Sequence, residues 1–325
     1  MRNKFLVKVT RLIPEEGIIM LKEKGCEVEI SPFDRVLTKA ELKSFVVGAD
    51  AILSLLTDKI DGEVLDAAGP QLKIVANYAV GFDNIDLAAA KTRKIFVTNV
   101  AAPEVSEAVA EHTFGLMLDI ARRISEGDRF LRAGKYLGWE PMLLLGDGLD
   151  GKTLGIVGLG RIGTSVARRA TRGFRMKVLY NDVKQNPDFE AEFGGRFVAK
   201  LDDLLPQCDV ITLHVPLLPS TFHLIDSKKL SLMKRTAILI NTSRGPVVDE
   251  KALVEILKKR KIAGAGLDVY EAEPALSPGL LELENIVITP HTASATMGAR
   301  QAMSRAAAEN IIAVVEGAEP GNVVR

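Results

Sequence analysis

The stretch Thr153-Leu-Gly-Ile-Val-Gly-Leu-Gly-Arg-Ile-Gly163 decides how the middle of this chain folds. Its apolar beginning predicts a short strand, and Val166 and Ala170 then recur four residues apart, which is a helical spacing. A second apolar run, Val178–Tyr180, follows and leads to Asp182. A strand, a glycine-rich turn, a helix and a second strand make a βαβ unit, so we expect two parallel strands here.

The glycines of that unit, Gly158-x-Gly160-x-x-Gly163, have the spacing of a dinucleotide-binding turn. We expect Gly158 to allow the tight turn, Gly160 to let a pyrophosphate approach the backbone, and Gly163 to let helix and strand pack closely. The free amides at the helix start favour the negative phosphates. Asp182, about twenty residues beyond the turn, is expected to accept hydrogen bonds from the hydroxyls of the adenine-side ribose.

Composition and charge are those of an ordinary globular enzyme. The chain has 325 residues, of which 47% are hydrophobic and 26% charged, and its 42 basic and 42 acidic residues balance. This balance predicts neither a nucleic-acid surface nor a membrane surface, and no apolar run is long enough to span a bilayer. Cys26 and Cys208 are expected to be reduced thiols, and Met1–Phe5 lacks a signal-peptide apolar run. We therefore expect a cytoplasmic protein.

Short apolar runs alternate with helical segments on both sides of the glycine turn, which predicts parallel sheets covered by helices. A helix from about Pro103 to Leu131 would link the two halves, and a last helix would run from about Thr296 to Glu316. We predict an α/β fold with two doubly wound parallel-sheet domains. A dinucleotide-binding domain, residues 102–289, would be inserted into a domain formed by residues 1–101 and 290–325. The expected strands are residues 5–9, 28–30, 51–55, 72–76, 95–98, 154–157, 178–180, 209–213, 237–241, 265–269 and 286–289.

Three polar residues follow predicted strands in the second half of the chain: Arg244, Glu273 and His291. Ligands of open α/β sheets bind at the carboxyl ends of the strands, so these side chains could meet there. Reduction of a ketone by NADH requires a proton donor at the oxygen, and a histidine titrates near neutrality. Glu273 would orient His291, and Arg244 would hold a substrate carboxylate. Amides of Val80 and Gly81 could bind its other oxygen, whereas His112, within a helix, is expected to be structural.

Four motifs in order resemble those of the D-isomer-specific 2-hydroxyacid dehydrogenases: the glycine turn, Asn241-Thr-Ser-Arg-Gly-Pro-Val-Val-Asp249, Ala263-Gly-Ala-Gly-Leu-Asp-Val-Tyr-Glu-Ala-Glu-Pro274 and Thr289-Pro-His291. The resemblance covers nearly the whole chain. It implies a Rossmann NAD-binding domain inserted into a flavodoxin-like substrate domain. It also implies hydride transfer from NADH to a small 2-oxo acid, with His291 as general acid and base and with no metal.

Within this family the chain is most similar to glyoxylate/hydroxypyruvate reductases, on the segments Leu55–Lys59, Ala76–Asp86 and Trp139–Leu143. The resemblance implies a homodimer, and the loop 134–151 with Trp139 would reach an active site, either its own or that of the partner. The implied substrate contacts are Leu55, Ala79, Val80, Gly81, Trp139 and Arg244. The implied cofactor contacts are Gly158, Leu159, Gly160, Arg161, Ile162, Gly163, Asp182, His214, Val215, Pro216, Thr221, Thr242, Ser243 and Asp268.

The sequence departs from the family's pattern at two places. NADPH-dependent members often carry a small residue followed by arginine where this chain has Asp182-Val-Lys184. A carboxylate would repel a 2′-phosphate, so we expect NAD(H) rather than NADP(H). The last motif continues as Thr292-Ala-Ser294, where isoleucine and glycine are commoner, and this changes the side chains near the nicotinamide.

Three other functions fit the same scaffold. A short-type D-3-phosphoglycerate dehydrogenase would need cations for its substrate phosphate, and only Lys59 lies near the expected loops. Phosphite oxidation goes with lysine at the position of Val80, which argues against it. An NAD-sensing corepressor without enzymatic activity can keep the arginine, glutamate and histidine, so turnover of a 2-oxo acid decides between enzyme and sensor.

Overall fold

The computed structural model describes residues 4–324. Residues 1–3, on which the signal-peptide expectation partly depends, and residue 325 lie outside the described part. The chain divides into two compact units. One comprises the residues up to Val105 together with those from Ala295 onward, and the other is Ser106–Ser294. The boundaries predicted from the sequence, after residues 101 and 289, lie a few residues before these divisions.

The first unit is built on a five-stranded parallel sheet with the strand order β2-β1-β3-β4-β5. This order is that of flavodoxin-like folds, as expected. Helix starts are capped by side chains, because Asp61 and Asp86 accept hydrogen bonds from the amides of Val64 and Ala89. The elements are β1 (Leu6–Val9), α1 (Glu15–Glu23), β2 (Glu27–Ile30), α2 (Lys39–Phe45), β3 (Ala51–Leu55), α3 (Gly62–Ala68), β4 (Ile74–Tyr78), α4 (Leu87–Thr92) and β5 (Phe96–Thr98).

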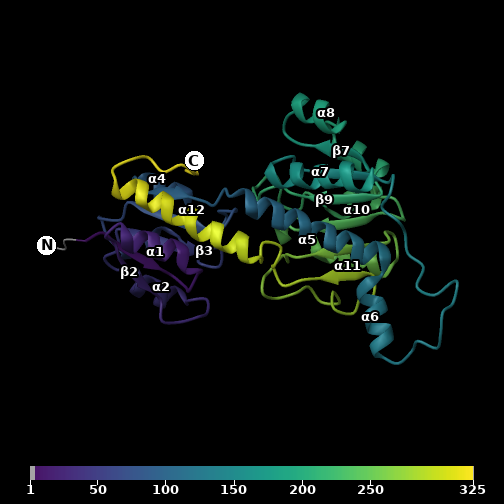
Figure 1. Ribbon diagram of the computed structural model, residues 1–325, viewed down its shortest axis with the longest axis horizontal. Coiled ribbons are helices and arrows are strands. Elements are labelled where there is room, and N and C mark those ends of the chain that lie inside the picture. Colours follow the sequence, from purple (N-terminus) through teal and green to yellow (C-terminus); the bar gives the residue numbers. More distant parts are fainter. Residues whose placement is uncertain (1–3, 325) are drawn as a thin grey trace. The chain divides into compact units, whose positions relative to one another are not determined.

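The last helix, α12 (Met297–Val315), belongs to this first unit and packs against α1 and β4 (Figure 1). The crossing with α1 is close, because a Cβ on Gly17 would lie 2.2 Å from the Ser304 carbonyl oxygen. Ser304 Oγ accepts from the Gly17 amide at 3.0 Å and donates to the Pro14 carbonyl at 2.6 Å. The final helix thus packs within the first unit.

The second unit contains a seven-stranded parallel sheet with the strand order β12-β11-β10-β9-β6-β7-β8. The order reverses beside β6, as in Rossmann folds, so the predicted fold class is confirmed for both units. The sequence did not predict the short edge strand β8. The elements are β6 (Thr153–Val157), α7 (Arg161–Phe174), β7 (Lys177–Asn181), α8 (Pro187–Phe193), β8 (Arg196–Phe197), α9 (Leu201–Leu204), β9 (Val210–Leu213), α10 (Ser227–Leu232), β10 (Ile238–Asn241), α11 (Glu250–Lys258), β11 (Gly264–Leu267) and β12 (Ile286–Ile288).

The single long helix predicted over residues 103–131 is wrong. The structure has two helices, α5 (Pro103–Arg122) and α6 (Ile124–Arg132), because Arg123 adopts the left-handed conformation with φ +54°. Asp119, in the last turns of α5, accepts hydrogen bonds from the amide and hydroxyl of Ser125, at 2.7 and 2.5 Å, and so satisfies one of the free amides at the start of α6. Hydrophobic periodicity missed the break, since apolar residues continue through it.

Helix α5 packs on the sheet through a buried face that includes Phe114, Leu116 and Met117. Truncating a fully buried side chain of this size costs about 2–5 kcal/mol. Helix α6, by contrast, has no buried residue. Within residues 4–324, no helix combines the length and the apolar character that crossing a bilayer requires.

Candidate functional site

The glycine turn lies where β6 ends and packs against the end of β9. Gly158 has φ +93°, and a Cβ there would lie 2.8 Å from the carbonyl of His214. A Cβ on Gly163 would lie 2.3 Å from the Gly158 carbonyl oxygen, so this glycine lets α7 approach the strand. Around Gly160, in contrast, an added Cβ meets no described atom within 4 Å. The first and last glycines therefore allow neighbouring backbone segments to pack closely, whereas the middle glycine borders open space.

These features fit the pyrophosphate of a dinucleotide. Gly160 is the N-cap of α7 and provides no side-chain cap, so the first amides of the helix stay available to an anion. Asp182 lies beside the turn, since its carboxylate accepts hydrogen bonds from the amides of Leu159 and Val183, both at 2.6 Å. The turn thus places helix amides next to open space and a fixed carboxylate at the far end of the βαβ unit.

His291 and Glu273 form a hydrogen-bonded pair within the second unit. The distance from His291 Nδ1 to Glu273 Oε2 is 2.9 Å, and Glu273 Oε1 accepts from the Tyr270 amide at 3.0 Å. Burial would raise the pKa of the Glu273 carboxyl, but the hydrogen bonds from His291 and Tyr270 outweigh it and lower this pKa. Glu273 is therefore an ionised acceptor, and among the described residues His291 Nε2 has no hydrogen-bond partner.

Arg244 follows β10 and is held close to the segment that carries Glu273. A Cβ on Gly245 would lie 1.9 Å from the carbonyl of Tyr270, so only glycine permits this approach. Asn241 Nδ2 donates to the Arg244 carbonyl at 2.9 Å, and the guanidinium donates to the Ser243 carbonyl at 2.9 Å. The positive charge of Arg244 also contributes to the lowered pKa of Glu273. The structure thus brings together all three residues that the sequence singled out.

A buried aspartate fixes the turn that carries His291. Asp268 is 0% exposed, and its carboxylate accepts from the amides of Thr292 and Ala293 at 2.8 and 2.7 Å. Its carbonyl accepts from the His291 amide at 2.9 Å. His291 itself has φ +55°, a conformation that costs about 1–3 kcal/mol in a residue other than glycine. The hydrogen bonds of Asp268 offset this strain and hold the ring in place.

His112 connects α5 to the same turn, a role that the sequence did not reveal. Its Nε2 lies 2.9 Å from Thr289 Oγ1 and 3.5 Å from Asp268 Oδ1. Thr289 Oγ1 donates to Asp268 Oδ1 at 2.6 Å, so its oxygen accepts from His112 Nε2. Burial opposes the charge of Asp268, but the hydrogen bonds from His112, Thr289 and the turn amides lower its pKa. Residues 112 and 289 are too far apart in sequence for spacing to pair them.

Other cofactor candidates use their side chains within the protein. Thr242 Oγ1 lies 3.0 Å from Thr113 Oγ1, and Ser243 Oγ donates to Asn241 Oδ1 at 2.8 Å. Thr221 Oγ1 donates to the Pro216 carbonyl at 2.6 Å and so closes its own loop. The hydroxyl hydrogens of Ser243 and Thr221 are thus used within the protein, which leaves their oxygens and backbone groups for a ligand.

His214 is held as a neutral ring at the end of β9. Its Nε2 lies 2.9 Å from Thr212 Oγ1, and its Nδ1 is buried without a hydrogen-bond partner among residues 4–324. Burial lowers the pKa of His214 to about 3. The adjoining Val215 and Pro216 continue the loop beside Gly158.

The remaining candidates are the implied substrate contacts other than Arg244, and they come from other parts of the chain. Leu55, Ala79, Val80 and Gly81 belong to the first unit, where Leu55 ends β3 and the other three follow β4. Trp139 lies in the irregular segment between α6 and β6 and is 81% exposed. It therefore does not pack into the arrangement around His291.

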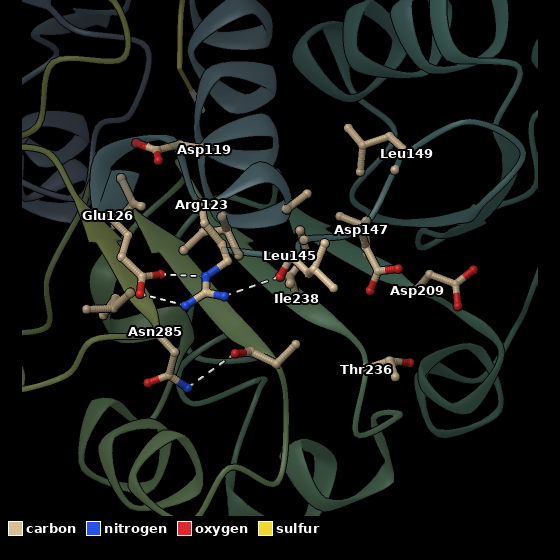
Figure 2. A pocket seen from close by; sticks show the side chains of 18 of the residues that line it. Asp119, Arg123, Glu126, Leu145, Asp147, Leu149, Asp209, Thr236, Ile238 and Asn285 are labelled. Carbon is tan, nitrogen blue, oxygen red and sulfur yellow. Dashed lines mark hydrogen bonds and ion pairs between the residues drawn. The ribbon is translucent and has the colours of Figure 1, made fainter. Parts of the chain in front are cut away.

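A cavity of about 460 Å³ lies at the opposite edge of the second unit's sheet (Figure 2). It is lined by residues at the amino ends of strands, including Val210, Ile238 and Ile286, whereas His291 follows a carboxyl end. Arg123, which lines the cavity, donates to the Glu126 carboxylate and to the Leu145 carbonyl (Figure 2). This cavity is separate from the glycine turn and from the His291–Glu273 pair.

The chain belongs to the D-isomer-specific 2-hydroxyacid dehydrogenase family. Residues 114–293, more than half of the chain, match the family model described as "D-isomer specific 2-hydroxyacid dehydrogenase, NAD binding domain". The matched region holds the glycine turn and the Arg244, Glu273 and His291 positions. The second unit is accordingly a domain that binds a nicotinamide dinucleotide.

Individual relatives match over nearly their full length. A glyoxylate reductase of Thermococcus litoralis is 48% identical over 322 residues, which cover 98% of this chain and 96% of that protein. The crystal structure of the TT0316 protein from Thermus thermophilus has a TM-score of 0.89 and 45% identity, and the match covers 98% of this chain and all of that one. An NADPH-dependent glyoxylate/hydroxypyruvate reductase from Sinorhizobium meliloti, in complex with NADP and malonate, has a TM-score of 0.85 and 32% identity, with 99% and 97% covered.

Proposed function

We propose that the protein reduces a small 2-oxo acid, glyoxylate or hydroxypyruvate, to the 2-hydroxy acid with NADH, giving the D-isomer where the product is chiral. The observation that carries the proposal is the 2.9 Å hydrogen bond between His291 Nδ1 and Glu273 Oε2. It fixes the tautomer in which Nε2 exchanges the proton with the substrate oxygen. The names of full-length relatives, which are glyoxylate reductases, support the substrate class.

His291 would act as general acid in the reducing direction and as general base in the other. Bound NADH supplies the hydride to the carbonyl carbon. Protonated His291 then gives its Nε2 proton to the carbonyl oxygen, becomes neutral and takes up a proton from solvent. The ionised Glu273 stabilises the imidazolium form before transfer, because the two opposite charges share a hydrogen bond.

Arg244 and the turn after β4 would bind the substrate carboxylate. A guanidinium can donate two parallel hydrogen bonds to a carboxylate and can also polarise the neighbouring carbonyl. The amides of Val80 and Gly81 would receive the other carboxylate oxygen. A panel of glyoxylate, hydroxypyruvate, pyruvate, 2-oxoglutarate and 3-phosphohydroxypyruvate, each with NADH and NADPH, tests this function. Turnover of 3-phosphohydroxypyruvate alone would favour the phosphoglycerate alternative, and no turnover at all would favour the sensor.

We infer a preference for NAD(H) from Asp182. Its carboxylate is fixed by the Leu159 and Val183 amides at the end of β7, where an adenine-side ribose would lie. A 2′-phosphate would meet this negative charge, whereas ribose hydroxyls could donate to it. The relative from Sinorhizobium meliloti is described as NADPH-dependent, so the ratio of the two cofactors has to be measured on this chain.

We also propose a homodimer that uses the segment from α6 to residue 145. This short stretch exposes many large apolar side chains, which is typical of an interaction surface and unusual for a free one. They are Ile124, Leu131, Tyr136, Leu137, Trp139, Met142 and Leu145. Leu145 also lines the cavity of Figure 2, so a second copy could cover segment and cavity together.

Sedimentation of the Leu137→Asp/Met142→Asp double variant tests the dimer. We expect a dimeric wild type and a monomeric variant. Leu281→Asp is the matched control, because Leu281 is also exposed and apolar but lies elsewhere. A monomeric wild type would refute the proposal.

The reduced, buried thiols of Cys26 and Cys208 support a cytoplasmic location, in which such thiols stay reduced.

A further inference from the structure

The turn Ala79–Gly81 has three successive carbonyls that are all bound by protein donors. The Ala79 carbonyl accepts from the Val100 amide at 2.8 Å, and the Val80 carbonyl accepts from Asn99 Nδ2 at 2.6 Å. The Gly81 carbonyl accepts from Asn77 Nδ2 at 2.9 Å. Two of the three donors are asparagine side chains at or just beyond the ends of neighbouring strands, β4 and β5.

Fixing these carbonyls also fixes the amides. In a trans peptide the N–H of one residue points opposite to the carbonyl of the residue before it. With the carbonyls of Ala79 and Val80 turned toward the protein, the amides of Val80 and Gly81 are turned away from those donors. Within residues 4–324, neither amide donates to a protein acceptor. Two adjacent free amides of this kind suit a carboxylate.

One of the two asparagine donors, Asn77, is itself held by further hydrogen bonds. Asn77 is 1% exposed, and its Oδ1 accepts from Ser54 Oγ at 3.0 Å. Its Nδ2 also donates to Asn84 Oδ1 at 3.0 Å. Asn84 Nδ2 in turn donates to the carbonyls of Leu55 and Asp58, at 3.1 and 3.0 Å. The network therefore joins the turn after β4 to the loop after β3.

We propose that Asn99 and Asn77 are positioning residues for substrate binding, because they hold the Val80 and Gly81 amides in the orientation that receives a carboxylate. The inference rests on the proposed function, in which these amides bind the 2-oxo acid. Neither asparagine touches the substrate. Their contribution is preorganisation: without Asn99, the Val80 carbonyl loses its donor and the peptide between Val80 and Gly81 is free to rotate.

The test compares Asn99→Ala and Asn99→Asp with wild type and with Gln71→Ala. Gln71 is the matched control, because its Nε2 also donates to two backbone carbonyls of the first unit, those of Ala49 and Ala68. Calorimetry measures the Kd of oxalate, a non-reacting dicarboxylate, with the NADH-bound enzyme. Kinetics give KM and kcat for glyoxylate, and fluorescence gives the Kd of NADH. Thermal unfolding verifies that each variant is folded.

For both Asn99 variants we expect the oxalate Kd and the glyoxylate KM to rise about tenfold, with larger increases for the aspartate, whose oxygen would face the Val80 carbonyl. The kcat and the Kd of NADH should stay within about twofold of wild type, since neither depends on this turn. Gln71→Ala should leave all four constants unchanged.

The two proposals can fail separately. A folded Asn99→Ala enzyme with unchanged oxalate Kd and glyoxylate KM would overturn the positioning role and leave the proposed function standing. A wild type that reduces no 2-oxo acid, but whose binding of oxalate is weakened by Asn99→Ala, would overturn the function alone. A wild type that neither reduces glyoxylate nor binds oxalate would overturn both.

Discussion

Nε2 of His112 lies 2.9 Å from Oγ1 of Thr289, two residues before His291. This contact ties a helix of the nucleotide-binding unit to the turn that presents the proposed proton donor. Thr289 passes the hydrogen bond on to Asp268, which binds the amides on the other side of His291. The left-handed conformation of His291 is thus held from both flanks.

His112→Ala should lower kcat for glyoxylate about tenfold while the KM stays close to wild type, because a mobile turn misplaces the proton donor without touching the substrate. His112→Gln retains an N–H donor and should recover most of the loss. Steady-state kinetics of the two variants check this prediction. Equal losses of kcat in both, or a loss only of thermal stability, would mean that the contact does not position His291.

His291→Asn should lower kcat by about 10²–10⁴-fold, because proton transfer to the substrate oxygen then depends on water. NADH should still bind with nearly wild-type affinity, since the glycine turn is untouched. Stopped-flow turnover and fluorescence titration of NADH measure the two quantities. Glu273→Gln should also lower kcat, because it removes the charge that stabilises the imidazolium. An enzyme that turns over normally without His291 would refute the assignment.

The sequence predicted the parts of the fold and site that depend on local pattern. Strand ends, helix starts and glycine spacing are local features of a sequence. They therefore predicted the glycine turn, most strands and the polar residues that follow strands. The break at Arg123 was missed, because the left-handed conformation of Arg123 and the hydrogen bonds from Ser125 to Asp119 lie within a continuous apolar pattern. The positioning roles of His112 and Asn99 were not recognised, because each acts through a hydrogen bond to a residue distant in the sequence. That of Asn77 was missed because its bond to the Gly81 carbonyl depends on the shape of the turn, which the sequence pattern does not give.

Asp182→Ser should relax the preference for NADH over NADPH. The substitution removes a negative charge next to the position expected for a 2′-phosphate, and serine can still donate to it. The Leu159 and Val183 amides, which now bind the carboxylate, would become available to the phosphate. The ratio of kcat/KM for the two cofactors, with glyoxylate saturating, measures the effect. An identical ratio in variant and wild type would show that Asp182 is not the selector.

The lowered pKa of the half-buried His214 ring predicts a stability that falls on the acid side. Burial lowers its pKa in the folded protein to about 3, against an ordinary value of 6.5. Below pH 6.5 the unfolded chain takes up a proton that the folded protein cannot accept. The neutral His214 ring therefore contributes fully to the free energy of unfolding above pH 6.5. This contribution is lost as the pH falls toward 3, at about 1.4 kcal/mol per pH unit.

His214→Asn should remove this acid-side loss, because asparagine does not titrate and can still bond to Thr212. From pH 7 to pH 5, the nucleotide-binding unit of the wild type should lose about 2 kcal/mol that the variant retains. This corresponds to roughly 4–8 °C in Tm for a unit of this size. Calorimetry of both proteins without cofactor, at pH 7 and pH 5, provides the four Tm values. The prediction is wrong if the difference in Tm between variant and wild type is the same at both pH values. In that case His214 takes up its proton as easily in the folded protein as in the unfolded chain.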